Sequence, residues 1–181
     1  KKANQYFATG FVSILSIAII LGLIWNYYLQ PLCVILGANS DTIDLVLEYG
    51  KCIMAFAPVF MMSNYFAPIV RNMKNPKLVM CAVLTGSVLN VILDYVFVFP
   101  MDMGMFGAAA ATVIGSLTTL LVLSTHFIKK QNRVKINKET ISLNLLAPIF
   151  KCGFSSLIME VASGFVIFIF NIQILKYIGN N

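Results

Sequence analysis

The chain has 181 residues, of which 59% are hydrophobic and only 11% are charged, and its formal net charge is +6. About a quarter of the residues of an average soluble domain are charged, so this composition excludes an ordinary soluble fold. The basic residues fall mostly between long apolar stretches and form no continuous face, which argues against a nucleic-acid surface.

Five apolar stretches are each long enough to cross a bilayer, which takes about 20 helical residues. Transmembrane strands are excluded, because a barrel strand needs only about 9–11 residues and alternates polar with apolar side chains. The sequence therefore predicts an all-α membrane protein, a polytopic antiparallel helix bundle. The predicted spans are approximately 6–28, 46–70, 78–99, 104–128 and 148–178.

The first span ends in an aromatic cluster, which is typical of the headgroup region. After Pro31, the apolar run 32–36 is too short to cross the membrane, so we expect it to lie along the interface. The second span is expected to begin with Asn39 or Ser40 as its N-cap. Asp41 and Asp44 would then lie in the first turn, where negative charge complements the helix dipole.

The second span contains Pro58 near its middle. A proline inside a helix frees a carbonyl group and bends the axis, so Pro58 marks either a flexing point or a static kink. Met61, Met62 and Tyr65 follow it and are candidates for lining a cavity that adapts to varied shapes. The alternative for these three residues is packing in the core or against lipid.

The charge distribution predicts the topology. Eleven of the thirteen basic residues fall on one side of the membrane if the helices alternate in direction. The positive-inside rule then makes the loops 71–77 and 129–147 cytoplasmic in a protein of the plasma or inner membrane. These loops are topology signals, with only a minor role in contacts with anionic membrane lipids.

The segment 129–147 is polar, basic and longer than the other connections, so it is expected to link two membrane bundles. Residues 1–128 would form part of an N-terminal lobe, and residues 148–181 would supply the first helix of a second lobe. Both ends of the chain lie close to a span, which suggests a fragment of a larger bundle. The missing remainder of the same polypeptide is therefore an expected partner.

No pattern of residues indicates an enzyme. The four cysteines show neither CxxC pairing nor metal-ligand spacing, and no nucleophile–base pair, phosphate loop or zinc motif is present. We therefore expect no cofactor and no resident metal.

The third span carries an acidic side chain, Asp94, with Asn90 one helical turn before it on the same face. A carboxylate in a bilayer costs at least about 3 kcal/mol, so its default role is functional. Asp94 is about 9 Å from the outer end of its span, and Thr112 in the fourth span is expected at a similar depth. The three residues could then bind Na⁺ or share a hydrogen bond with a protonated Asp94. The alternative is a structural Asp bonded to the backbone of a neighbouring helix.

The last span carries a second acidic candidate, Glu160, in the inner half of the membrane. Ser156 and Ser163 flank it, and the alternative is that they simply satisfy its hydrogen bonds. Asn171 is a candidate for lining a cavity. His126 lies near the cytoplasmic end of the fourth span and is expected to be interfacial rather than catalytic.

Several of these stretches resemble the MATE (multidrug and toxic compound extrusion) family. Residues 90–97, with Asn-x-x-x-Asp, and 103–112, with Gly-x-x-Gly-Ala-Ala, resemble its fifth and sixth helices. Residues 71–76, Arg-Asn-Met-Lys-Asn-Pro, resemble the loop after its fourth helix, and 153–160 resemble the start of its seventh. The resemblance covers essentially the whole chain, which would supply the third to seventh of twelve helices.

The resemblance implies two six-helix lobes around a central cavity that opens alternately to the two membrane faces. It further implies export of cationic or amphipathic drugs and toxins in exchange for Na⁺ or H⁺. Asn90, Asp94 and Thr112 match the polar cluster of the family's N-terminal lobe, and Glu160 matches its acidic position on the seventh helix.

Two other functions remain open. A lipid-linked oligosaccharide flippase of the same superfamily would need a more cationic cavity to meet pyrophosphate, whereas the intramembrane charges here are acidic. A non-transporting membrane scaffold would leave the polar residues of the spans at scattered, unrelated positions.

Overall fold

The computed structural model describes residues 2–35, 42–128 and 143–178. These ranges are almost entirely helical and contain no strand, which confirms the predicted all-α fold. The helices are α1 (Lys2–Ile35), α2 (Ile43–Ala55), α3 (Ala57–Asn72), α4 (Pro76–Val98), α5 (Gly104–Ile128), the short 3₁₀ helix η2 (Leu143–Leu145) and α6 (Leu146–Ile178).

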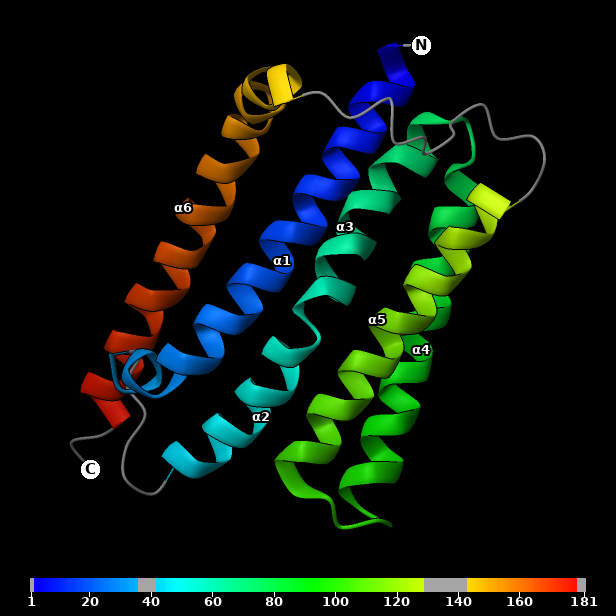
Figure 1. Cartoon of the computed structure of the whole chain (residues 1–181). Coiled ribbons are helices and arrows are strands. Elements are labelled where there is room, and N and C mark those ends of the chain that lie inside the picture. The colour runs from blue at the N-terminus through cyan, green and yellow to red at the C-terminus, as the bar shows by residue number, and fades with distance from the viewer. Residues whose placement is uncertain (1, 36–41, 129–142, 179–181) are drawn as a thin grey trace.

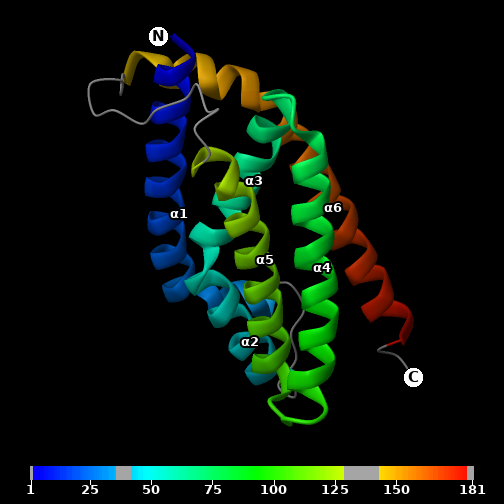
Figure 2. The same cartoon turned by 90° about the vertical axis from the view of Figure 1, so that its right-hand side faces the viewer.

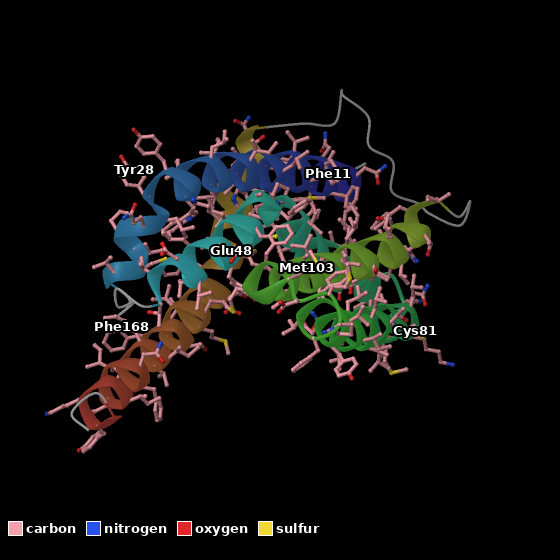
Figure 3. All side chains as sticks on the ribbon, turned by 90° about the horizontal axis from the view of Figure 1, so that it is seen from below. Phe11, Tyr28, Glu48, Cys81, Met103 and Phe168 are labelled. Atoms are coloured by element: carbon pink, nitrogen blue, oxygen red, sulfur yellow. The ribbon has the colours of Figure 1, made fainter. Side chains whose placement is uncertain are left out.

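The helices alternate in direction (Figures 1 and 2). The order across the bundle is α1, the α2–α3 pair, α5 and α4, whereas α6 contacts only α1 and η2 among the described helices and leads away from the bundle in Figure 3. We call the end with the α3–α4 turn the inner end and the end with the α4–α5 turn the outer end, after the predicted topology. Among the described residues, four helices are long and apolar enough to span a membrane, and the bent α2–α3 pair passes the same length and composition criterion when its two helices are taken together, so this is a multi-pass membrane protein.

The first helix is longer than its predicted span. It continues through Pro31 to Ile35, so the run after Pro31 is helical up to Ile35, and its placement along the interface stays a prediction. Its extension is held by packing, because Leu29 and Cys33 are both buried there. Figure 1 shows these last turns almost end-on, across the direction of the rest of α1.

The second predicted span is two helices. They meet at Phe56, which is not helical, and their axes differ by 54°. Pro58 is the second residue of α3, where a missing N–H costs nothing because the first turn of a helix has no partner for it. The bend was therefore predicted, but the break falls two residues before the proline. Thr42 precedes α2 and Asp44 lies in its first turn, whereas Asn39, Ser40 and Asp41 lie outside the described residues.

The core lies at the inner end, where α1, α3, α4 and α5 meet. Aromatic rings dominate it: the ring centroids of Phe66 and Phe127 are 4.7 Å apart, and those of Phe7 and Phe127 are 5.3 Å apart. This cluster fixes the inner ends of three helices that supply polar residues further out. The buried members of the core are Phe7, Met62, Phe66, Val70, Val79, Ala82 and Leu123.

The start of α4 is fixed beside this core. The side chain of Asn75 caps the helix, because its Oδ1 accepts a hydrogen bond of 3.4 Å from the backbone N–H of Leu78. The Nδ2 of Asn75 lies 3.3 Å from Nδ1 of His126 near the end of α5. The α4 and α5 helices are therefore linked at their inner ends by polar side chains.

Candidate functional site

Two polar side chains meet between α4 and α5, outward from the aromatic core. The Nδ2 of Asn90 donates to the Oγ1 of Thr112 at 3.4 Å, and the Thr112 hydroxyl donates to the carbonyl of Ala108 at 3.0 Å. Asn90 lies eight residues before the end of α4 at Val98, and Thr112 lies eight residues after Gly104. Both are therefore about 12 Å from the outer ends of their helices.

The third predicted member, Asp94, lies one turn further out than this pair. It is four residues before Val98, or about 6 Å from the end of α4, rather than the expected 9 Å. The difference arises because α4 ends before the turn to α5 that the sequence estimate had included. Asn90, and not Asp94, thus lies at the depth of Thr112.

The side chain of Asp94 is half-buried, and one of its two carboxylate oxygens is enclosed. Its Oδ1 is buried and has no hydrogen-bond partner within the described ranges. This oxygen therefore makes no bond there to a neighbouring backbone, as the structural alternative had required. A buried carboxylate oxygen without a donor is costly, and a proton or a cation removes that cost.

Asn90 and Thr112 line a cavity of about 230 Å³ between α3, α4 and α5. Its walls offer amide and hydroxyl groups and no charged side chain, and Asp94 is not among its lining residues. The complete lining is Phe60, Ser63, Asn64, Val83, Gly86, Ser87, Asn90, Thr112, Gly115, Ser116 and Thr119.

Sequence reasoning missed several polar residues of this cavity. Helical spacing could have found two of them, because Ser87 precedes Asn90 by three residues and Ser116 follows Thr112 by four. The contribution of Asn64 had no such signal, since it depends on how the separate helix α3 packs against the other two.

Hydrogen bonds between helices fix the walls of the cavity. The hydroxyl of Ser63 on α3 donates to the carbonyl of Ser116 on α5 at 3.2 Å. The hydroxyl of Thr119 on α5 lies within hydrogen-bond distance of the Ala82 carbonyl on α4, at 3.3 Å, and of the Gly115 carbonyl in its own helix. The α5 helix is thus tied to both neighbours.

A second cavity, of about 830 Å³, lies between α2 and the outer half of α5. Figure 3 views the bundle from the outer end and shows Glu48 on α2 facing the region of Met103 and the start of α5. Asp44, Glu48 and Lys51 line this cavity, but all three side chains are exposed. These charged side chains are exposed and, among the described residues, make no contact that would assemble a site, so the smaller cavity, with its inter-helix polar contact, remains the candidate site.

The predicted cavity-lining residues of α3 lie in a different place. Met62 is buried in the aromatic core, Met61 is half-buried, and the hydroxyl of Tyr65 donates to the carbonyl of Phe7 at 2.8 Å. None of the three lines either cavity described above. A role for them in binding cargo stays a prediction.

The candidates on α6 are exposed. Glu160 and Asn171 both project from a helix on which no described side chain is buried. The hydroxyl of Ser163 donates to the carbonyl of Met159 at 3.0 Å, so it does not satisfy Glu160. The structure therefore brings Asn90 and Thr112 together near Asp94, while Glu160 and Asn171 lie apart from this group.

In the part of the chain that the structure describes, no three His, Cys, Asp or Glu side chains are grouped so that they could hold a metal ion. An ion bound near Asp94 would therefore take most of its ligands from neutral oxygens. Oxygen ligands of this kind suit hard cations better than metals that prefer thiolate or imidazole ligands.

Comparisons with known proteins agree with this architecture. The sequence model of the MatE family matches residues 1–96. The multidrug export protein MepA of Staphylococcus aureus (strain MSSA476) is 31% identical over 186 aligned residues, which cover 98% of this chain and 41% of that protein. MepA of Staphylococcus saprophyticus is 28% identical over the same extent. The chain thus spans about 41% of the length of these curated relatives.

A solved structure also resembles the fold. It is described as an inward-facing conformation of a multidrug resistance MATE family transporter of the MOP superfamily. The two superpose with a TM-score of 0.76 and 25% sequence identity, over 83% of this chain and 35% of the other.

Proposed function

Because this chain belongs to the MatE family, we propose that the intact protein exports amphipathic cationic drugs or toxins across the cell membrane in exchange for Na⁺ or H⁺. The names of its relatives support export of multiple drugs. The chain itself supplies the coupling site, and the intact protein alternates between states open to either membrane face.

One observation carries the coupling site: the buried, unbonded Oδ1 of Asp94 lies one turn from the Asn90–Thr112 contact. A group that takes up a driving ion must be more stable with the ion than without it. Asp94 meets this need when Asn90 and Thr112 supply neutral oxygens to Na⁺, or hydrogen bonds to the protonated carboxyl. Cargo cations would be released when the site is occupied, because the bound ion neutralises the Asp94 carboxylate and removes its attraction for a second cation in a medium of low dielectric constant.

The test is Asp94→Asn in the intact transporter, reconstituted into proteoliposomes. Export of a fluorescent amphipathic cation is driven either by a Na⁺ gradient or by a pH gradient, each imposed alone. We expect Asp94→Asn to abolish gradient-driven export while membrane insertion is unchanged. The gradient that drives the unmodified protein identifies the coupling ion.

The matched control is Asp102→Asn. Asp102 lies in the exposed α4–α5 turn with a positive φ of 50°, a conformation that asparagine adopts readily. We expect this variant to export normally. Full gradient-driven export by Asp94→Asn would overturn the assignment of coupling to Asp94.

A further inference from the structure

We propose that Gly86 and Gly115 are positioning residues for the Asn90–Thr112 pair, because together they set the separation of α4 and α5 at which the two side chains meet. The proposal rests on the proposed function, since the role it assigns is in binding the coupling ion. Neither glycine touches the ion in this proposal. Each acts by allowing two helix backbones to come into contact one turn from the site.

The two glycines face each other across the helix interface. A Cβ placed on Gly115 would lie 2.8 Å from the carbonyl oxygen of Gly86 and 2.9 Å from the Cβ of Asn90. A Cβ placed on Gly86 would lie 2.6 Å from the carbonyl oxygen of Gly115 and would overlap the hydroxyl of Thr119. The backbone atoms cannot rotate away, so a methyl group at either position must push the helices apart.

The site lies on the next turn of both helices. Asn90 follows Gly86 by four residues, and Thr112 precedes Gly115 by three, so all four positions share one interface. The distance of 3.4 Å between Asn90 Nδ2 and Thr112 Oγ1 is already long for a hydrogen bond. A further separation of a few tenths of an ångström therefore removes this contact.

A third glycine holds the outer side of the same interface. A Cβ on Gly107 would lie 3.0 Å from the Cβ of Phe97, three residues after Asp94. The helices therefore approach closely both inward and outward of the polar group. The polar group of Asn90, Asp94 and Thr112 lies between these two contacts. The distance between α4 and α5 at this group therefore depends on both the inner and the outer contact.

The consequence for ion binding is specific. Residues that only orient the ligands of a metal ion change its affinity by about 10-fold to 100-fold when they are altered. Gly86 and Gly115 should act in the same way, by moving Asn90 relative to Thr112. Affinity for the coupling ion should fall, while the maximal rate at a saturating ion concentration should change much less.

The experiment compares Gly115→Ala and Gly86→Ala in the intact transporter, reconstituted into proteoliposomes. It measures the ion concentration, Na⁺ or H⁺, that gives half-maximal export of a fluorescent amphipathic cation. Ion-dependent thermal stabilisation of the purified variants is measured alongside. We expect the half-saturating ion concentration to rise by about 10-fold or more in both variants.

Two controls separate positioning from general damage. Gly164→Ala makes the same change on α6, where no described atom lies within 4 Å of the added methyl, and should leave the ion dependence unchanged. Leu123→Ala removes a fully buried side chain from α5 itself. It should lower the stability of the protein without moving the half-saturating concentration.

The outcomes distinguish the positioning role of the two glycines from the coupling role of Asp94. An unchanged ion dependence in Gly115→Ala and Gly86→Ala overturns the positioning role, even when Asp94→Asn abolishes coupling. Unaltered coupling in Asp94→Asn instead removes the site, and the proposed function with it. Should Gly86→Ala fail to insert, Gly115→Ala carries the test, because its nearest contact is longer. If the half-saturating ion concentration rises by the same factor in the glycine variants and in Leu123→Ala, the effect is only structural, and the proposal is also overturned.

Discussion

The hydroxyl of Tyr65 donates a 2.8 Å hydrogen bond to the carbonyl oxygen of Phe7, which joins the middle of α3 to the start of α1 across 58 positions of sequence. The ring of Tyr65 stacks against that of Phe7, with centroids 5.9 Å apart. One side chain thus contributes both a ring and a donor to the inner core.

Tyr65→Phe tests the donor alone, because it keeps the ring. We expect the free energy of unfolding of the intact protein to fall by about 1 kcal/mol, the usual net value of such a bond. The measurement is thermal or denaturant unfolding in detergent. Tyr27→Phe is the matched control, because Tyr27 is 85% exposed at the far end of α1. An equal loss in both variants would contradict the role of the Phe7 contact.

Leu123 and Leu121 provide a test of the core on one helix. Leu123 is fully buried, whereas Leu121, two residues before it on α5, is 60% exposed. We expect Leu123→Ala to cost about 2 to 5 kcal/mol, because it leaves a cavity among packed side chains. Leu121→Ala should cost far less, and both are measured by unfolding in the same detergent. A larger cost for Leu121→Ala would mean that the face described here as exposed is packed in the intact protein.

Asn64 tests whether the 230 Å³ cavity holds cargo. Its side chain reaches the cavity from α3 and is not part of the Asn90–Thr112 contact. Leucine has a bulk similar to that of asparagine, so Asn64→Leu removes a hydrogen-bond donor and an acceptor while it still fills the space. The cargo concentration for half-maximal export should therefore rise about 10-fold, the equivalent of one lost hydrogen bond. The half-saturating ion concentration should stay constant. Asn72→Leu, at the exposed inner end of α3, is the control. If the half-saturating ion concentration changes while the half-saturating cargo concentration does not, Asn64 contributes to ion binding instead.

The sequence predicted most of the helices because bilayer spans leave a strong signal. The spans 78–99 and 104–128 nearly coincide with α4 and α5, since each is bounded by turn residues and contains few charges. The break at Phe56 was placed less well. A proline restricts the chain before it, but packing of the inner half decides at which residue the helix ends.

The site was predicted in part for similar reasons. Asn90 and Asp94 share a face by helical spacing alone. The depth estimate brought Thr112 to this part of α4 but matched it with Asp94, whereas the structure places it against Asn90. The close approach at Gly86 and Gly115 could not be predicted, because it depends on how two helices rotate about their own axes. Placing Met62 and Tyr65 in the core likewise required the packing of three helices.

The break at Phe56 divides the α2–α3 segment into two arms that are buried to different extents. The inner arm, α3, is anchored, because Met62, Phe66 and Val70 are buried in the aromatic core. The outer arm, α2, has no buried side chain and borders the 830 Å³ cavity beside α5. The inner arm is therefore enclosed by its neighbours, whereas the outer arm packs against α1 and α5 only through side chains that stay partly exposed. A substitution on α2 should consequently disturb the packing less than the same substitution on the buried face of α3.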